Sequence, residues 1–130
     1  MFIDDIEIND MHIRIAEILL DIIHSRQENI ITYKELSIKL DREVYEEQLG
    51  GYLGALSDCC LKLGLPQISA MVVNGQSYMP GRGFFKYYYP CAKEKDYIDI
   101  FVGCCHKIKA AELSGEWIKL EEMLNIDRRI

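Results

Sequence analysis

The sequence lacks any long hydrophobic run. Its apolar stretches, such as AEILLDII, are interrupted by Asp or Glu well short of the ~20 residues that a membrane-spanning helix needs. The first ten residues, MFIDDIEIND, have neither the basic region nor the apolar core of a signal peptide. We therefore expect a cytoplasmic protein with no membrane partner.

The chain also lacks the even, spaced cysteine set of a secreted disulfide scaffold. Neighbouring cysteines on a helix point about 100° apart, whereas zinc ligands are usually two to four residues apart. We expect reduced, buried thiols and no metal or other cofactor. The alternative is a zinc site in which the two adjacent pairs supply four thiolates, or a Cys/His set that includes His106. The five cysteines are Cys59, Cys60, Cys91, Cys104 and Cys105.

Positive charge is scarce and unevenly placed. The chain has 15 Lys and Arg against 21 Asp and Glu, which gives a formal net charge of −6. Residues 1–65 hold 6 basic and 13 acidic side chains, whereas residues 66–130 hold 9 and 8. An acidic first half repels phosphates, so a nucleic-acid partner requires a local basic face.

Length and composition are those of one ordinary domain. At 130 residues, with 49% hydrophobic and 28% charged side chains, the chain is long enough for one core and has little room for a second. We expect a single domain over residues 1–130. Apolar residues at helical spacing predict a long first helix over 9–27, capped by Asn9 or Asp10.

A helix-turn-helix is predicted over residues 32–64. Thr32 followed by Glu35 is a capping box that opens a short helix, and a third helix follows with Gly64 as its C-terminal stop. Glycines in that third helix cost about 1 kcal/mol each relative to Ala. Close packing between the second and third helices is the expected reason for them. These glycines are Gly50, Gly51 and Gly54.

A β-hairpin is predicted over about 67–89. The segment QISAMVV has the composition of a buried strand, Asn74 and Gly75 suit a tight turn, and GFFKYYY is expected to be a second strand whose residues alternate between its two faces. Two further helices are expected over about 95–125. The expected fold class is thus α+β: a mainly helical winged helix-turn-helix with a small hairpin wing and C-terminal helices.

These segments resemble a known domain. ITYKEL, LGGYLGALSDCCLKLGLP, ISAMVVN and MPGRGFF, followed by Trp117 in a C-terminal helix, are similar to the winged-helix domain of phage and bacterial restriction-associated proteins. The resemblance covers about residues 30–120. It implies a fold and an association with nucleic acid in a defence or regulatory context, and it implies no activity.

A more distant likeness is to the DNA-binding domain of alkylguanine alkyltransferases, which shares the TY-x-EL helix start, the glycine-containing helix and the Val-Val strand. In that family a reactive Cys lies in a Pro-Cys-His-Arg segment just before Val-Val. Here those positions are Ser69, Ala70 and Met71, so alkyl transfer is excluded on this resemblance. His106 next to Cys105 diverges from it on a helix, and no nuclease or phosphate-loop motif is present. We expect no enzyme.

Two function classes remain open. A nucleic-acid-binding module would use a basic and aromatic edge near the wing to contact duplex DNA, with polar residues of the third helix beside it. The alternative for this edge is strand core with a solvated basic face. The candidate contacts are Arg82, Lys86, Tyr87, Lys93, Gln48 and Tyr52.

The second class is a small acidic protein-interaction factor, such as a phage-encoded inhibitor of a host defence or restriction enzyme. Carboxylates at the start of the third helix would repel DNA phosphates but suit a basic groove on a protein partner. The candidate partner-binding residues are Glu43, Glu46 and Glu47.

Overall fold

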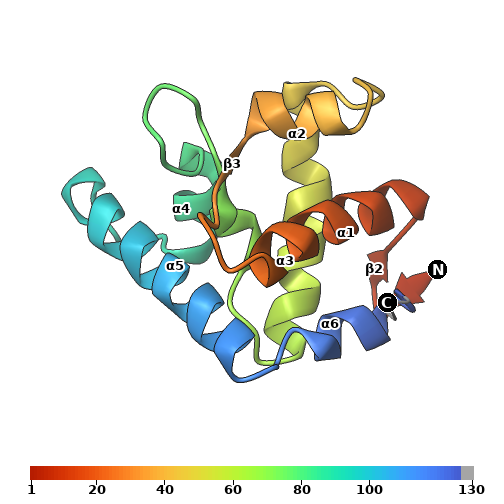
Figure 1. Cartoon of the computed structure of the whole chain (residues 1–130). Coiled ribbons are helices and arrows are strands. Elements are labelled where there is room, and N and C mark those ends of the chain that lie inside the picture. Colours follow the sequence, from red (N-terminus) through yellow and green to blue (C-terminus); the bar gives the residue numbers. More distant parts are fainter. Residues whose placement is uncertain (127–130) are drawn as a thin grey trace.

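The computed structural model describes residues 1–126 and is mainly helical, with two short strand pairs (Figure 1). Strands β1 (Phe2–Ile3) and β2 (Ile6–Glu7) pair antiparallel at the N-terminus. Strand β3 (Ile31–Thr32) pairs in parallel with β4 (Val72–Val73). The fold class is therefore α+β, as expected.

The first helix begins where its capping residue predicts. Helix α1 (Asp10–His24) has Asn9 as its N-cap, and the Asn9 side-chain oxygen accepts the N–H groups of Met11 and His12. The imidazole Nδ1 of His12 accepts the Asn9 N–H at 3.0 Å, which completes the box. The buried face of α1 carries Ile15, Ala16, Leu19, Leu20 and Ile23.

The predicted helix pair is present. Helix α2 (Tyr33–Lys39) starts at Thr32, whose Oγ1 accepts the Glu35 N–H while Glu35 Oε1 accepts the Thr32 N–H, both at 3.0 Å. A 3-10 turn, η1 (Glu46–Gln48), leads into helix α3 (Leu49–Lys62). Gly64 follows with a φ of +73°, the left-handed conformation that ends helices at glycine.

The predicted hairpin wing over 67–89 is wrong. Residues 68–71 form a 3-10 turn, η2 (Ile68–Met71), and only β4 is extended. The segment expected as the second strand is helix α4 (Arg82–Tyr88). Among the described residues β4 pairs with β3 instead. Its partner strand therefore lies 41 residues earlier in the chain and is not joined to it by a hairpin turn.

The C-terminal helices are confirmed. A turn, η3 (Glu94–Asp96), precedes helix α5 (Tyr97–Leu113), and helix α6 (Ile118–Met123) follows. Trp117 is fully buried at the start of α6, and its indole N–H donates to the Ile108 carbonyl at 3.1 Å. None of the helices within residues 1–126 is long and apolar enough to cross a membrane.

The core lies where α1, α3, η2 and α5 meet. Three of the five cysteines, Cys59, Cys60 and Cys104, are buried there as small apolar residues, as expected. Burial raises the pKa of the Cys60 thiol to about 12, so this thiol is protonated and unreactive. Cys91 differs from the expectation because it is exposed.

Candidate binding groove

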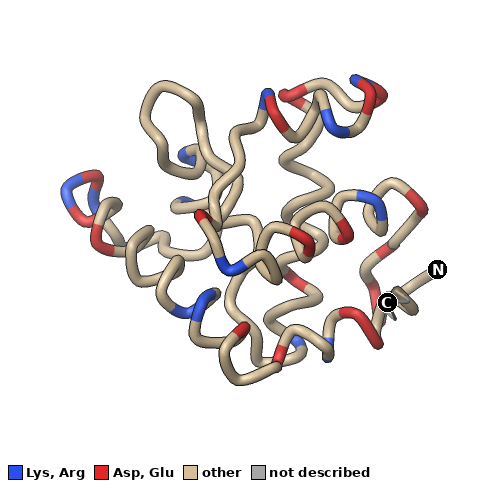
Figure 2. Tube along the Cα trace, viewed as in Figure 1, with Lys and Arg blue, Asp and Glu red and all other residues tan. Residues whose placement is uncertain are grey.

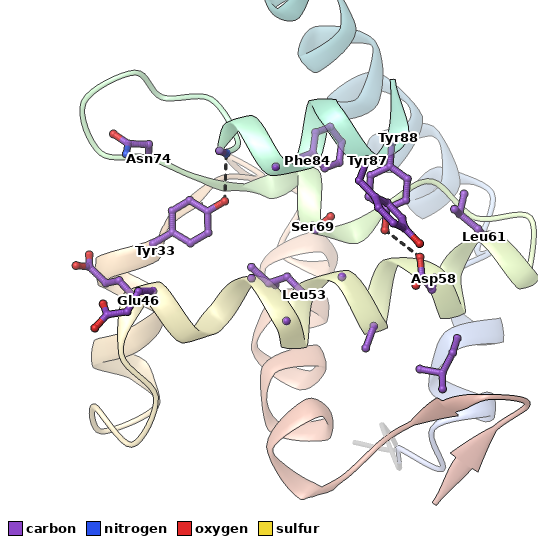
Figure 3. A pocket seen from close by; sticks show the side chains of 18 of the residues that line it. Tyr33, Glu46, Leu53, Asp58, Leu61, Ser69, Asn74, Phe84, Tyr87 and Tyr88 are labelled. Carbon is purple, nitrogen blue, oxygen red and sulfur yellow. Dashed lines mark hydrogen bonds between the residues drawn. The ribbon is translucent and has the colours of Figure 1, made fainter. Parts of the chain in front are cut away.

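A groove with a volume of about 1710 Å³ lies between α3 and α4. Helix α3 forms one wall, and the other is formed by the loop after β4 together with α4 (Figure 3). Its lining combines backbone, aromatic rings and carboxylates. The polar and aromatic residues of the lining include Tyr33, Glu46, Glu47, Asp58, Tyr87 and Tyr88.

Three glycines leave part of the α3 wall without side chains. A Cβ atom added at Gly50, Gly51 or Gly54 would meet nothing within 4 Å apart from its own helix. The expected close packing of α2 against these glycines is therefore wrong. The opposite face of α3 carries the buried Leu49, Leu56 and Cys59, so the helix has one face in the core and one open face, and Leu53 lies on the groove side.

A hydrogen bond ties the second wall to α2. The Tyr33 hydroxyl accepts the N–H of Gly81 at 3.2 Å, just before α4 begins. Asn74 holds the loop before it, because its side-chain oxygen accepts the N–H groups of Gln76 and Ser77. The turn predicted at Asn74 is thus present, although a helix follows it.

Aromatic packing positions α4. The Phe85 ring is buried and stacks on Tyr97 of α5, with centroids 3.9 Å apart and planes within 4°. Phe84, on the same helix, lines the groove and lies 5.3 Å from the Tyr88 ring. With Phe85 anchored, the following turn of α4 presents Tyr87 and Tyr88 to the groove.

One end of the groove holds a carboxylate between two elements. The Tyr88 hydroxyl donates to Asp58 Oδ1 of α3 at 3.1 Å (Figure 3). Partial burial and the neighbouring Asp58 charge raise the pKa of Tyr88, so its hydroxyl stays a protonated donor. The Tyr87 ring lies perpendicular to that of Tyr88, with centroids 4.8 Å apart.

The groove carries more acidic than basic side chains. Four carboxylates line it, those of Asp5, Glu46, Glu47 and Asp58, against the two ammonium groups of Lys34 and Lys62. Lys62 is already paired with Asp4 at 3.1 Å. The groove therefore has a negative potential that favours cationic ligands.

The residues predicted to contact nucleic acid are brought together only in part. Tyr87 lines the groove, whereas the other five are not among its described lining residues. Tyr52 packs edge-on against His12 at 4.7 Å, and the Gln48 side chain accepts the Tyr45 N–H. Arg82 and Lys86 are exposed on α4, and Lys93 is exposed at the start of η3.

These basic residues do not form a continuous basic face. Arg82 is paired with Glu94 at 3.1 Å, and the Asp96 carboxylate lies beside Lys93, where its Oδ2 accepts the Lys93 backbone N–H. Figure 2 shows acidic and basic positions mixed at the turn before α5. A duplex approaching this edge would meet both signs of charge.

The predicted acidic set is divided. Glu46 and Glu47 line the groove from η1, just before α3, while Glu43 binds Arg14 of α1 at 2.7 Å. Sequence reasoning missed Asp58 and Tyr88, whose contact joins positions 30 residues apart. The spacing of Phe84 and Tyr88, four residues apart, is compatible with one face of a helix but does not by itself distinguish a helix from a strand.

The segment that matches the reactive site of alkyltransferases is buried. Ser69 lines the groove, but its Oγ accepts the Ser57 hydroxyl at 2.6 Å and its N–H donates to the same Ser57 oxygen at 2.9 Å. Within residues 1–126 no three His, Cys, Asp or Glu side chains are gathered in a way that would hold a metal ion. Comparisons with family models, curated proteins and solved structures find no match to this chain.

Proposed function

We propose that the chain is a non-enzymatic protein-interaction module that receives a basic segment of a partner protein in the groove between α3 and α4. The observation that carries this proposal is the combination of an open, polymer-sized groove with an acidic and aromatic lining. A cytoplasmic defence or restriction enzyme, whose DNA-binding surface is basic, is a partner of suitable charge.

The size of the groove favours a polymer segment over a small metabolite. Small-molecule sites usually have volumes of about 300–1,000 Å³ and enclose most of the ligand. A volume of about 1710 Å³ exceeds that range. The open glycine face of α3 allows a backbone or a long side chain to approach the helix closely.

The chemistry of the lining supports binding without catalysis. The described lining contains no His and no Cys, and its buried serine, Ser69, is hydrogen-bonded to Ser57 rather than to a base. A serine nucleophile requires a neighbouring general base. The exposed groove residues Tyr87 and Leu61, 68% and 47% accessible, suit apolar contact with a partner instead.

Nucleic-acid association is the second candidate. It is favoured by the helix pair α2 and α3 and by the grouping of Arg82, Lys86 and Tyr87 on the single helix α4. In this version the module is related to winged-helix proteins but uses α4 in place of a hairpin. The groove carboxylates Glu46 and Glu47 stand against it, because they would lie near phosphates.

Charge reversal separates the two candidates. The probes are a labelled 12-residue peptide of alternating Leu and Lys, its Leu–Glu counterpart, and a labelled 20-base-pair duplex. We expect the Lys peptide alone to bind, and Glu46→Lys with Glu47→Lys to weaken it about tenfold, since each reversal replaces an attraction by a repulsion. Fluorescence anisotropy at several salt concentrations measures this.

A matched control distinguishes the groove from net charge. Glu28 and Glu122 are exposed acidic residues outside the described groove lining, so Glu28→Lys combined with Glu122→Lys changes the net charge by the same amount. If this control weakens the Lys peptide as strongly, the groove is not the site. Duplex binding that Arg82→Glu and Lys86→Glu abolish would establish the second candidate instead.

A further inference from the structure

The acidic end of the groove has a more specific geometry than the rest. Tyr87 and Tyr88 come from α4, and Asp58 comes from the facing side of α3 (Figure 3). The two rings are perpendicular, with centroids 4.8 Å apart, and Asp58 accepts the Tyr88 hydroxyl. Two aromatic rings and one carboxylate thus border the same space.

We propose that Tyr87, Tyr88 and Asp58 form a subsite for the side-chain cation of an arginine in the partner's basic segment. This inference rests on the proposed function, because it names the group that the acidic end of the groove recognises. The planar guanidinium stacks on the Tyr87 face and donates to the Asp58 carboxylate.

The carboxylate is available for such a contact. Within residues 1–126 Asp58 has no ion-pair partner; the neighbouring ammonium of Lys62 is bound to Asp4 at 3.1 Å. The Tyr88 hydroxyl donates to one carboxylate oxygen, Oδ1. An ionised carboxylate has about four acceptor sites, so the Asp58 carboxylate can still accept a hydrogen bond from a donor of the partner.

The ring geometry fits the same ligand. Tyr87 is 68% accessible, so its face can be covered by a partner without displacing the core. Tyr88 is half-buried and held by its hydrogen bond, so it is a fixed wall. Leu61, half-exposed at this end of the groove, offers apolar surface to the methylene stem of an arginine.

The test uses N-acetylarginine methylamide, with the neutral isostere N-acetylcitrulline methylamide as the control, titrated into the labelled protein and followed by NMR. We expect saturable shifts at Tyr87, Tyr88 and Asp58 with the arginine compound and none with citrulline. Tyr87→Ala and Asp58→Asn should each weaken the binding by about two- to fivefold, the range of an exposed cation–π contact. Tyr87→Phe should retain it, because the ring face remains.

Tyr45→Ala is the matched control, since Tyr45 is 61% accessible and outside the described groove lining. Equal shifts with arginine and citrulline, or binding that survives both Tyr87→Ala and Asp58→Asn, would overturn the subsite. If the Lys peptide binds the groove while the arginine compound does not shift these resonances, the subsite is wrong and the protein-interaction function stands. Arginine binding without peptide binding would instead refute the wider function.

Discussion

His24 joins the first helix to the last two, and its removal gives a prediction that depends on pH. Its imidazole Nδ1 lies 2.7 Å from Glu112 of α5, and its Nε2 lies 2.6 Å from Glu121 of α6. Both carboxylates are about 90% buried. Among residues 1–126, Arg26 also lies at this cluster, with its Nε 3.4 Å from Glu112.

The protonated imidazole is the form that satisfies both carboxylates, because only it has two N–H donors. Partial burial opposes the charge, but the hydrogen bonds and negative charges of Glu121 and Glu112 outweigh it, and the pKa of His24 is raised above 6.5. A raised folded-state pKa contributes stability that is complete below pH 6.5. This contribution is lost as the pH rises through the folded-state value.

His24→Gln removes this charged bridge. A hydrogen bond to a charged group contributes about 1.5–3 kcal/mol, and there are two, but His24 is one-third exposed and Arg26 still faces Glu112. We therefore expect a loss of about 2 kcal/mol at pH 6, or roughly 8 °C in melting temperature for a chain of this length. At pH 9 the difference should shrink below about 1 kcal/mol, since the neutral imidazole serves one carboxylate only.

Thermal unfolding of both proteins followed by circular dichroism between pH 5.5 and 9 measures the difference. His24 titration by NMR gives its pKa independently. Equal destabilisation at pH 6 and pH 9, or a pKa at or below 6.5, would refute the reasoning. A control variant at the exposed His106 should show no such pH dependence.

Two further changes test how the helices are fixed. Thr32→Ala removes the oxygen that accepts the Glu35 N–H and should cost about 1 kcal/mol in urea unfolding; no change would mean that this cap is not formed. Trp117→Phe removes the indole donor to Ile108 and leaves unfilled volume in the core, so a loss of about 2 kcal/mol is expected. For this variant, an unaltered melting temperature would contradict the burial of Trp117.

Local signals predicted the elements whose ends are set by local chemistry. Asn9 and Thr32 mark helix starts because their side chains accept amide hydrogens within three residues. Gly64 marks a helix end because it takes a left-handed conformation. Each of these interactions involves only residues within a few positions of one another. The local sequence is therefore sufficient to predict them.

Tertiary contacts explain why the segment over 84–88, predicted as a strand, is a helix. The aromatic-rich segment 84–88 is typical of a strand, but Phe84 and Tyr88 also lie four residues apart, which places them on one face of a helix. The stack of Phe85 on Tyr97 and the bond from Tyr88 to Asp58 hold α4. Both partners lie outside the segment, so its local pattern leaves helix and strand equally open.

The sequence predicted only part of the candidate site, because the rest depends on tertiary contacts. Glu46, Glu47 and Tyr87 were identified by charge and by aromatic character, and all three line the groove. Asp58 was missed because a single acidic residue on a helix is ordinary. Its role depends on its contact with Tyr88, which exists only after α4 has packed beside α3.

The glycines of α3 connect the fold to the proposed function. Each costs about 1 kcal/mol of helix propensity, and none is used for close packing, since the space over Gly50, Gly51 and Gly54 is open. A local rule that is broken without a packing gain is typical of a functional surface. Larger side chains at these positions would fill the groove between α3 and α4. The open wall is therefore best explained by a ligand that approaches the helix backbone, which is what a bound partner segment would do.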